Sequence, residues 1–349
     1  MSVKIKLIIV MTVIVAVVAG GIVLIELQQV SGITRNLSSQ STAYIARQQA
    51  QYWNGYMGGY MRVLRTAAGL MGHFEELPAG ERRNRYEEML ISIFEDQPDF
   101  IRMFTVWKPN ALDGMDARNI GRIGSTGTGQ FAFDLGRETG RISAYIPGSV
   151  VPAVMEHING PNTRKDSVDH PVPVTVLGKE VYAVRIFVPI INKSNGETVG
   201  AVGCLLDIDF VRLGAEAAIM EYGEVSSLSV YSGNGFIMGS YNPERIGKML
   251  IDSETQFGEY ISIANDAVNH GREFWCSGYD QLLSTTLQIV MVPVAIGNSD
   301  TTWSVMVGTA EWYVLRDVTA MTRFAITLLI MALIIAVVII NIVLSAILT

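Results

Sequence analysis

Side chains with binding chemistry gather in one short loop, residues 104–116, which reads FTVWKPNALDGMD. Trp107 offers an apolar wall, and Asp113 and Asp116 offer acceptors for a cationic or hydroxyl group of a small ligand. A calcium site on Asn110, Asp113 and Asp116 is an alternative, although it departs from the EF-hand spacing and supplies fewer than the roughly 6–8 oxygens that Ca²⁺ takes. A structural turn is the third interpretation, because Asn and Asp side chains bond nearby backbone. All three stay open at the level of sequence.

The sequence has no pattern typical of an enzyme, so we expect no catalysis, no cofactor and no metal ion. The histidines form neither an i,i+4 pair nor a metal spacing with the cysteines, and no P-loop, Gly-x-Ser-x-Gly or kinase signature occurs. Cys204 and Cys276 are expected to be free and mostly buried. The net charge of -7 argues against nucleic acid as a partner. Arg82, Arg83 and Arg85 are interpreted as a solvated helix face, because glutamates surround them.

Both ends of the chain are apolar enough to cross a membrane. Residues 5–26 carry only Lys6 and Glu26, one near each edge, and residues 323–348 carry only Arg323 at their outer edge, so each contains the roughly 20 apolar residues that span a bilayer. A cleaved signal peptide is the alternative for the first, but its apolar run is longer than the about 7–15 residues of a signal core. Lys4 and Lys6 place residues 1–4 in the cytoplasm. We therefore expect a two-pass protein of the inner (plasma) membrane with a large periplasmic or extracellular domain.

Between these spans the periodicity changes from helical to strand-like. Apolar residues recur every three or four positions over 30–74, which predicts a long amphipathic stalk helix within residues 27–80. A second helix is expected over 81–94, and a later one over 211–222. Strands are expected over 101–106, 130–135, 180–191, 198–208, 226–231, 236–240, 287–295 and 303–309. Glycine-containing turns predict hairpins at 191–198 and 231–236. Two sheets in tandem are favoured over one mixed sheet, because the helix at 211–222 interrupts the strands.

Four tracts, taken in order, resemble the double Cache sensor domains of bacterial methyl-accepting chemotaxis proteins and related sensor kinases. They are VWKPNALDGMDARN (106–119), VYAVRIFVPIINKSNGETVGAVGCLLDIDFVRL (181–213), SLSVYSGNGFIMGSYNPERIGKML (227–250) and WSVMVGTAEWYVLRDV (303–318). The resemblance implies an α+β fold, in which a long N-terminal stalk helix precedes two tandem PAS-like Cache modules of antiparallel sheets with flanking helices, bracketed by two transmembrane helices. It implies a membrane-distal module at 81–212 and a membrane-proximal module at 213–318.

The same resemblance implies a chemoreceptor sensory region. Such a region would bind a small-molecule ligand in its distal module, pass a displacement to the second span and form a homodimer through the stalk helix. The cytoplasmic signalling output is missing from this chain, so we expect the sensory portion of a longer receptor. The alternatives are the sensor region of a histidine kinase or a cyclase, and a non-signalling membrane-anchored scaffold or adhesion protein.

Amino-acid-sensing members of this family carry an Arg-x-Trp-Tyr motif and an aspartate in the closing strand, and neither is clear here. The tract at 125–143, STGTGQFAFDLGRETGRIS, has no Trp-Tyr pair. The aspartate position falls on Leu205, although Asp207 faces the same side by strand alternation. Tyr182 and Arg185 lie an odd step apart and should face opposite sides. With Trp107, Asp113 and Asp116, the ligand-binding candidates are therefore Phe131, Arg137, Tyr145, Tyr182 and Asp207.

Overall fold

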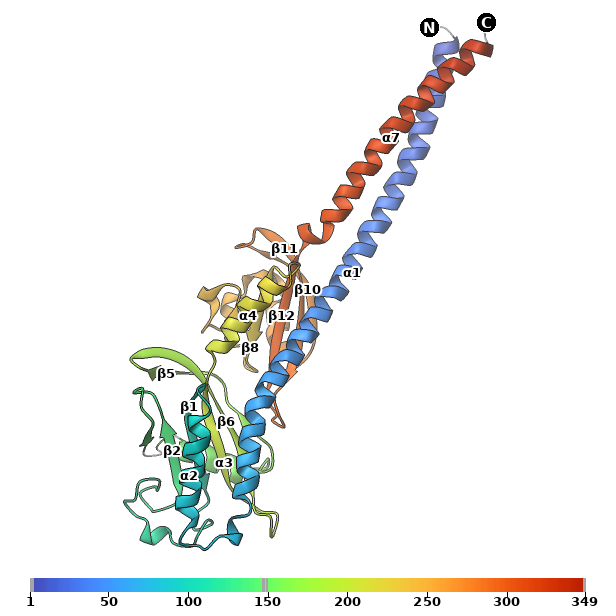
Figure 1. Cartoon of the computed structure of the whole chain (residues 1–349). Coiled ribbons are helices and arrows are strands. Elements are labelled where there is room, and N and C mark those ends of the chain that lie inside the picture. The colour runs from blue at the N-terminus through green and yellow to red at the C-terminus, as the bar shows by residue number, and fades with distance from the viewer. Residues whose placement is uncertain (1–2, 146–147, 149, 348–349) are drawn as a thin grey trace.

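The computed structural model describes residues 3–145, 148 and 150–347 and arranges two groups of strands along one long helix (Figure 1). The α-helices are α1 (Val3–Met71), α2 (Arg82–Glu95), α3 (Val150–Asn159), α4 (Asp209–Glu221), α5 (Leu250–Ser253), α6 (Ile261–Asn269) and α7 (Glu311–Ile347). The strands are β1 (Phe100–Trp107), β2 (Ala132–Gly136), β3 (Ser143–Tyr145), β4 (Ser167–Val168), β5 (Val172–Val176), β6 (Lys179–Ile191), β7 (Thr198–Asp207), β8 (Ser227–Tyr231), β9 (Ile237–Ser240), β10 (Phe274–Asp280), β11 (Thr285–Ala295) and β12 (Thr302–Ala310).

Helix α1 confirms the long amphipathic stalk helix that the periodicity predicts. Trp53, Met57, Met61 and Leu64 recur on one face and are fully buried. The helix ends at Met71 and is followed by Gly72, where a Cβ would lie 2.4 Å from the carbonyl oxygen of Ile191, so only glycine allows this approach to the β6–β7 hairpin. The stalk therefore packs against the sheets rather than standing free.

The first sheet has seven strands in the order β3-β2-β1-β7-β6-β4, with β5 also paired to β6. The predicted hairpin at 191–198 joins β6 to β7. Strand β1 is buried on both faces: Met103 and Trp107 join the core with α1 and α2, whereas Phe104 and Val106 join a separate core with α3. Helices α1 and α2 thus cover one face, and α3 covers the other.

The second sheet has five strands in the order β10-β11-β12-β8-β9, and its β8–β9 hairpin was also predicted. One face packs on α1 and α4, and the other packs on α5 and α6. Because α4 lies between the two sheets in sequence, the prediction of two tandem sheets is confirmed. Strand β12 ends at Ala310 and α7 begins at Glu311, so no loop separates the last strand from the exit helix.

A polar cluster centred on Arg245 is buried in this second module. The Arg245 Nη1–H groups donate to Glu254 at 2.7 Å and to the Gln256 side-chain oxygen at 2.8 Å. Its Nη2 lies 3.5 Å from an Asp280 carboxylate oxygen, and both carboxylates are 0% exposed. Tyr231 donates to the other oxygen of Glu254 at 2.9 Å. The cluster joins the turn after β9 to the end of β10.

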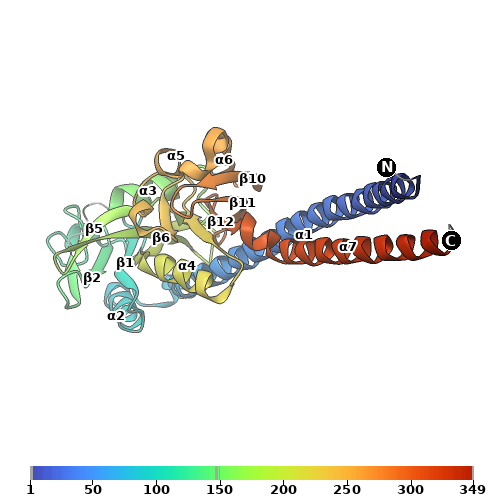
Figure 2. The same cartoon turned by 90° about the horizontal axis from the view of Figure 1, so that it is seen from above.

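Helix α1 connects both modules, and it runs beside α7 where the two helices leave the second module (Figures 1 and 2). One hydrophobic core contains residues of α1 and of both sheets. The Thr42 and Thr309 hydroxyls, on α1 and β12, form a buried hydrogen bond of 2.8 Å. Within the described residues, two helical segments are long and apolar enough to cross a membrane, one in α1 and one at Ala320–Ile339 in α7. The start of α1 and the end of α7 lie at the same end of the molecule.

Candidate functional site

Trp107 lies on the face of the first sheet that packs on α1 and α2. Its ring stacks on Tyr86 of α2, with 5.9 Å between ring centroids and 15° between planes, and meets the edge of Phe74. Its indole N–H donates to the Thr105 hydroxyl at 3.1 Å, so its one polar atom has a partner. The side chain is 0% exposed and belongs to the main core.

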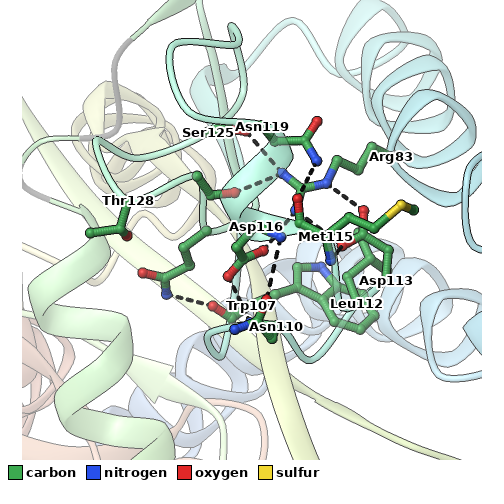
Figure 3. A network of polar contacts seen from close by, with 12 residues as sticks. Arg83, Trp107, Asn110, Leu112, Asp113, Met115, Asp116, Asn119, Ser125 and Thr128 are labelled. Atoms are coloured by element: carbon green, nitrogen blue, oxygen red, sulfur yellow. Dashed lines mark hydrogen bonds and ion pairs between the residues drawn. The ribbon is translucent and has the colours of Figure 1, made fainter.

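Asp113 and Asp116 hold the guanidinium of Arg83 (Figure 3). Arg83 donates from Nε to Asp113 at 2.6 Å and from Nη2 to Asp116 at 2.7 Å. It also donates to the Ser125 hydroxyl and the Gly129 carbonyl, each at 2.9 Å. The interpretation of Arg83 as part of a solvated helix face was wrong, because its side chain is only 5% exposed and completes this network.

The polar atoms of the loop at 104–116 are engaged within the protein. The Asp116 carboxylate accepts from the Asn110 N–H at 2.7 Å, and the Asn110 side chain accepts in return from the Asp116 N–H. Burial would raise the pKa of Asp113, but hydrogen bonds from Arg83 and the Met115 N–H outweigh it, so the pKa lies below its ordinary value. Within the described part of the chain, no group of three or more His, Cys, Asp or Glu side chains is arranged to hold a metal ion.

The opposite face of the same sheet contains a cavity of about 240 Å³, which we call the distal cavity. Its floor is a row across three adjacent strands, because the register pairs Arg102 of β1 with Leu205 of β7, and Leu205 with Arg185 of β6. The complete lining is Arg102, Phe104, Val150, Asp169, His170, Val172, Arg185 and Leu205. Leu205 therefore occupies the cavity floor at the position where amino-acid sensors of the resembled family carry an aspartate.

The two floor arginines have carboxylate partners of their own. Arg102 donates to Glu138 and, at 3.1 Å, to Asp134, and its guanidinium lies 4.7 Å from the centre of the Tyr145 ring. Arg185 donates from Nε to Asp169 at 2.6 Å. Each arginine side chain is 26% exposed. Tyr145 is thus the predicted site residue that lies beside this cavity, through its contact with Arg102.

Phe131 and Arg137 lie on other surfaces of the first sheet. Phe131 is buried, and the Arg83 guanidinium lies 5.4 Å from its ring centre. Arg137 donates to the Phe94 carbonyl oxygen and stacks at 4.1 Å on the Phe94 ring. Neither residue lines the cavity between Arg102 and Arg185.

Tyr182 and Asp207 lie at the junction of the modules. Tyr182 meets Phe236 of the second module edge to face, with 5.0 Å between ring centroids. Both residues line a second cavity, of about 260 Å³. Burial raises the pKa of Asp207. Arg185 lines the distal cavity and Tyr182 does not, as the odd step between them predicts. The eight predicted residues are therefore dispersed over the Arg83 network and the core beside it, the distal cavity, the Phe94 contact of Arg137, and the junction.

Sequence analysis missed Arg102, Asp134 and Asp169. A signal for the first two was present, since each is a lone charge within an apolar strand, in FIRMFTVW and FAFDL. Asp134 is 0% exposed, and its Oδ1 has no hydrogen-bond partner. Burial raises its pKa to about 6, with Glu138 adding to the effect and Arg102 opposing it.

We expect Asp134 to make the stability of the protein depend on pH. The pKa of Asp134 is about 6 in the folded protein and 3.8 ordinarily, so the folded protein binds this proton more tightly than the unfolded chain does. The stability gained from the bound proton is therefore full below about pH 4 and is lost as the pH rises to 6. The free energy of unfolding of Asp134→Asn minus that of the wild type should therefore increase by on the order of 3 kcal/mol between pH 4 and pH 7. Denaturant titrations at several pH values measure this difference. If the difference in free energy of unfolding is the same at pH 4 and pH 7, the raised pKa of Asp134 is contradicted.

Comparisons with known proteins add information at the level of the fold. No protein-family model matches the chain, and no curated protein matches it. Among solved structures, the extracellular domain ascribed to the histidine kinase mmHK1S-Z3 has a TM-score of 0.65 at 20% identity, covering 82% of this chain and 98% of that domain. Methyl-accepting chemotaxis protein X has a TM-score of 0.62 at 18% identity, over 79% and 99%.

The periplasmic sensory domain of the Campylobacter jejuni chemoreceptor Tlp1 has a TM-score of 0.60 at 14% identity, covering 81% of this chain and 98% of that domain. At these identities the likeness establishes the fold alone. The chain has the fold of extracellular and periplasmic sensory domains of chemoreceptors and histidine kinases, with a long N-terminal helix and two antiparallel sheets.

Proposed function

We propose that this chain is a membrane-anchored sensory region, in which a small ligand binds the distal cavity and the second module passes the effect to α7. The observation that carries the proposal is the distal cavity itself, which combines an apolar wall with convergent charged groups on rigid strands. The fold shared with sensory domains supports the same role. The division into a distal module at 81–212 and a proximal module at 213–318 belongs to this proposal.

The path from the cavity to the exit helix follows packed elements. Strands β1, β6 and β7 form the cavity floor, and their other face packs on α1. Helix α1 then packs on β11 and β12, and β12 continues into α7. A ligand can bias this path only if it binds two conformations of the distal module with different affinities.

The apolar segments of α1 and α7 support a two-pass anchor in the inner (plasma) membrane, with both modules outside the cytoplasm. We include a homodimer through the stalk in the proposal. Ile33, Leu37 and Tyr44 of α1 are each 60–68% exposed and recur at heptad spacing, as a helical partner would require. A monomer in sedimentation equilibrium of the full chain in detergent would contradict the dimer.

The proposal predicts ligand-dependent stabilisation of the full chain in lipid nanodiscs. Thermal unfolding would be followed with amino acids, organic acids, sugars, polyamines, nucleobases and divalent ions. One class of compound should raise the midpoint temperature of unfolding in a saturable way, because a ligand at 100 times its Kd adds about 2.7 kcal/mol to the free energy of unfolding.

A matched pair of variants locates the site of that stabilisation. Leu205→Trp fills the cavity floor and should remove the shift, whereas Leu213→Trp, at a residue 52% exposed on α4, should keep it. No shift with any class would count against ligand sensing and favour a membrane-anchored scaffold. An equal shift in both variants would place the ligand elsewhere.

A further inference from the structure

The lining of the distal cavity presents more positive than negative charge. Two guanidiniums, of Arg102 and Arg185, face one carboxylate, that of Asp169, and the other described lining residues are His170 and apolar side chains. Asp134 and Glu138 bind Arg102 but do not line the cavity. Their contacts fix the orientation of the Arg102 guanidinium while they leave the cavity surface to the arginine. This favours an anionic ligand.

Both arginines retain donors for such a ligand. A guanidinium has five N–H donors in a planar fork. Within the described residues, carboxylates contact Nε and Nη1 of Arg102, and Nε and Nη2 of Arg185. Among the described residues, Nη2 of Arg102 and Nη1 of Arg185 have no partner, so each is able to donate to a ligand carboxylate.

The spacing of the two arginines indicates two anionic groups on one ligand. Arg102 and Arg185 lie two strands apart in one row, which separates their Cα atoms by roughly 9–10 Å. Between them lies Leu205, with Phe104 beside it, so the middle of the ligand would contact apolar atoms. A volume of about 240 Å³ is smaller than the roughly 300–1,000 Å³ of sites for drug-sized ligands.

We propose that the distal cavity binds a short aliphatic dicarboxylate, with one carboxylate on Arg102, the other on Arg185 and the methylene chain over Leu205 and Phe104. This inference rests on the proposed sensory function and names the class of its ligand. Arg185 is the sharper test residue, because Arg102 also pairs with the buried Asp134 and its loss would leave that charge uncompensated.

The test measures binding of succinate and glutarate to the full chain in nanodiscs, each beside its monoamide, by calorimetric titration. The monoamide has nearly the same shape and lacks one charge, so wild-type protein should bind the dicarboxylate at least about tenfold more tightly. In Arg185→Gln this preference should fall to near one. Arg122→Gln is the matched control, since Arg122 is 29% exposed, pairs with Glu87 in the same module and lies outside the cavity lining.

The outcomes distinguish failure of the dicarboxylate assignment from failure of the proposed sensory function. A preference that survives in Arg185→Gln, or no binding of either dicarboxylate, overturns the dicarboxylate assignment. In that case, saturable binding of a compound from another class would leave the sensory function standing, and no binding of any class would overturn that function too. If Arg185→Gln does not fold, Arg185→Lys keeps the charge but not the planar fork, and it should lose part of the preference.

Discussion

Replacing Arg83 with methionine is expected to lower the free energy of unfolding by about 3–5 kcal/mol. The substitution leaves Asp113 and Asp116 without their cation, and their side chains are only 2% and 9% exposed. The Ser125 hydroxyl and the Gly129 carbonyl also lose a donor. Thermal unfolding of the full chain in detergent, followed by near-UV circular dichroism, should show a midpoint lower by on the order of 10 °C.

Arg85→Met is the matched control for this prediction. Arg85 lies on the same helix, is 63% exposed and pairs with Glu88 at 3.8 Å, so its loss should change stability by less than about 1 kcal/mol. Adding Asp113→Asn and Asp116→Asn to Arg83→Met removes the uncompensated charges and should recover part of the loss. Equal midpoints for Arg83→Met and wild type would show that the loop at 104–116 does not depend on this network.

Arg245→Met should cost a similar amount, about 3–5 kcal/mol, in the second module. Glu254 and Asp280 are both 0% exposed, and without Arg245 two buried carboxylates remain near each other. The loss should appear as a lower denaturant midpoint for the transition that exposes Trp303, a fully buried residue of β12.

Arg272→Met serves as the control in the same module, because Arg272 is 60% exposed and its partner Asp266 is 50% exposed. The variant Arg245→Met with Glu254→Gln should recover stability, since it removes one of the two unpaired charges. If Arg245→Met and Arg272→Met lower the midpoint equally, the buried cluster contributes no more than a surface ion pair.

Sequence predicted the elements whose signals are local. The β6–β7 and β8–β9 hairpins have glycine-containing turns between apolar runs, and α1 has an apolar face repeated over many turns. Strand β10 was missed because its exposed positions carry Trp275 and Tyr279, so the expected alternation of apolar and polar residues is absent. Cys204 and Cys276 are free thiols, buried and half-buried, as predicted.

The candidate site was harder to predict, because it depends on which face of a strand each side chain takes. Strand β1 is apolar on both faces, so its sequence does not reveal that Trp107 faces α1 while Arg102 faces the cavity. The partners of Arg83 are separated from it by 30 and 33 residues, a distance over which periodicity carries no information. The assignment of all eight candidate residues to ligand contact stays a prediction.

Because β12 continues directly into α7, a tilt of the second sheet tilts the exit helix by the same angle. A helix of 37 residues at 1.5 Å per residue is about 55 Å long. With no loop after Ala310 to absorb a rotation, a tilt of the second sheet by only about 2° would displace the far end of α7 sideways by about 2 Å. A small rotation that begins at the distal cavity would thus produce a larger displacement at the far end of α7.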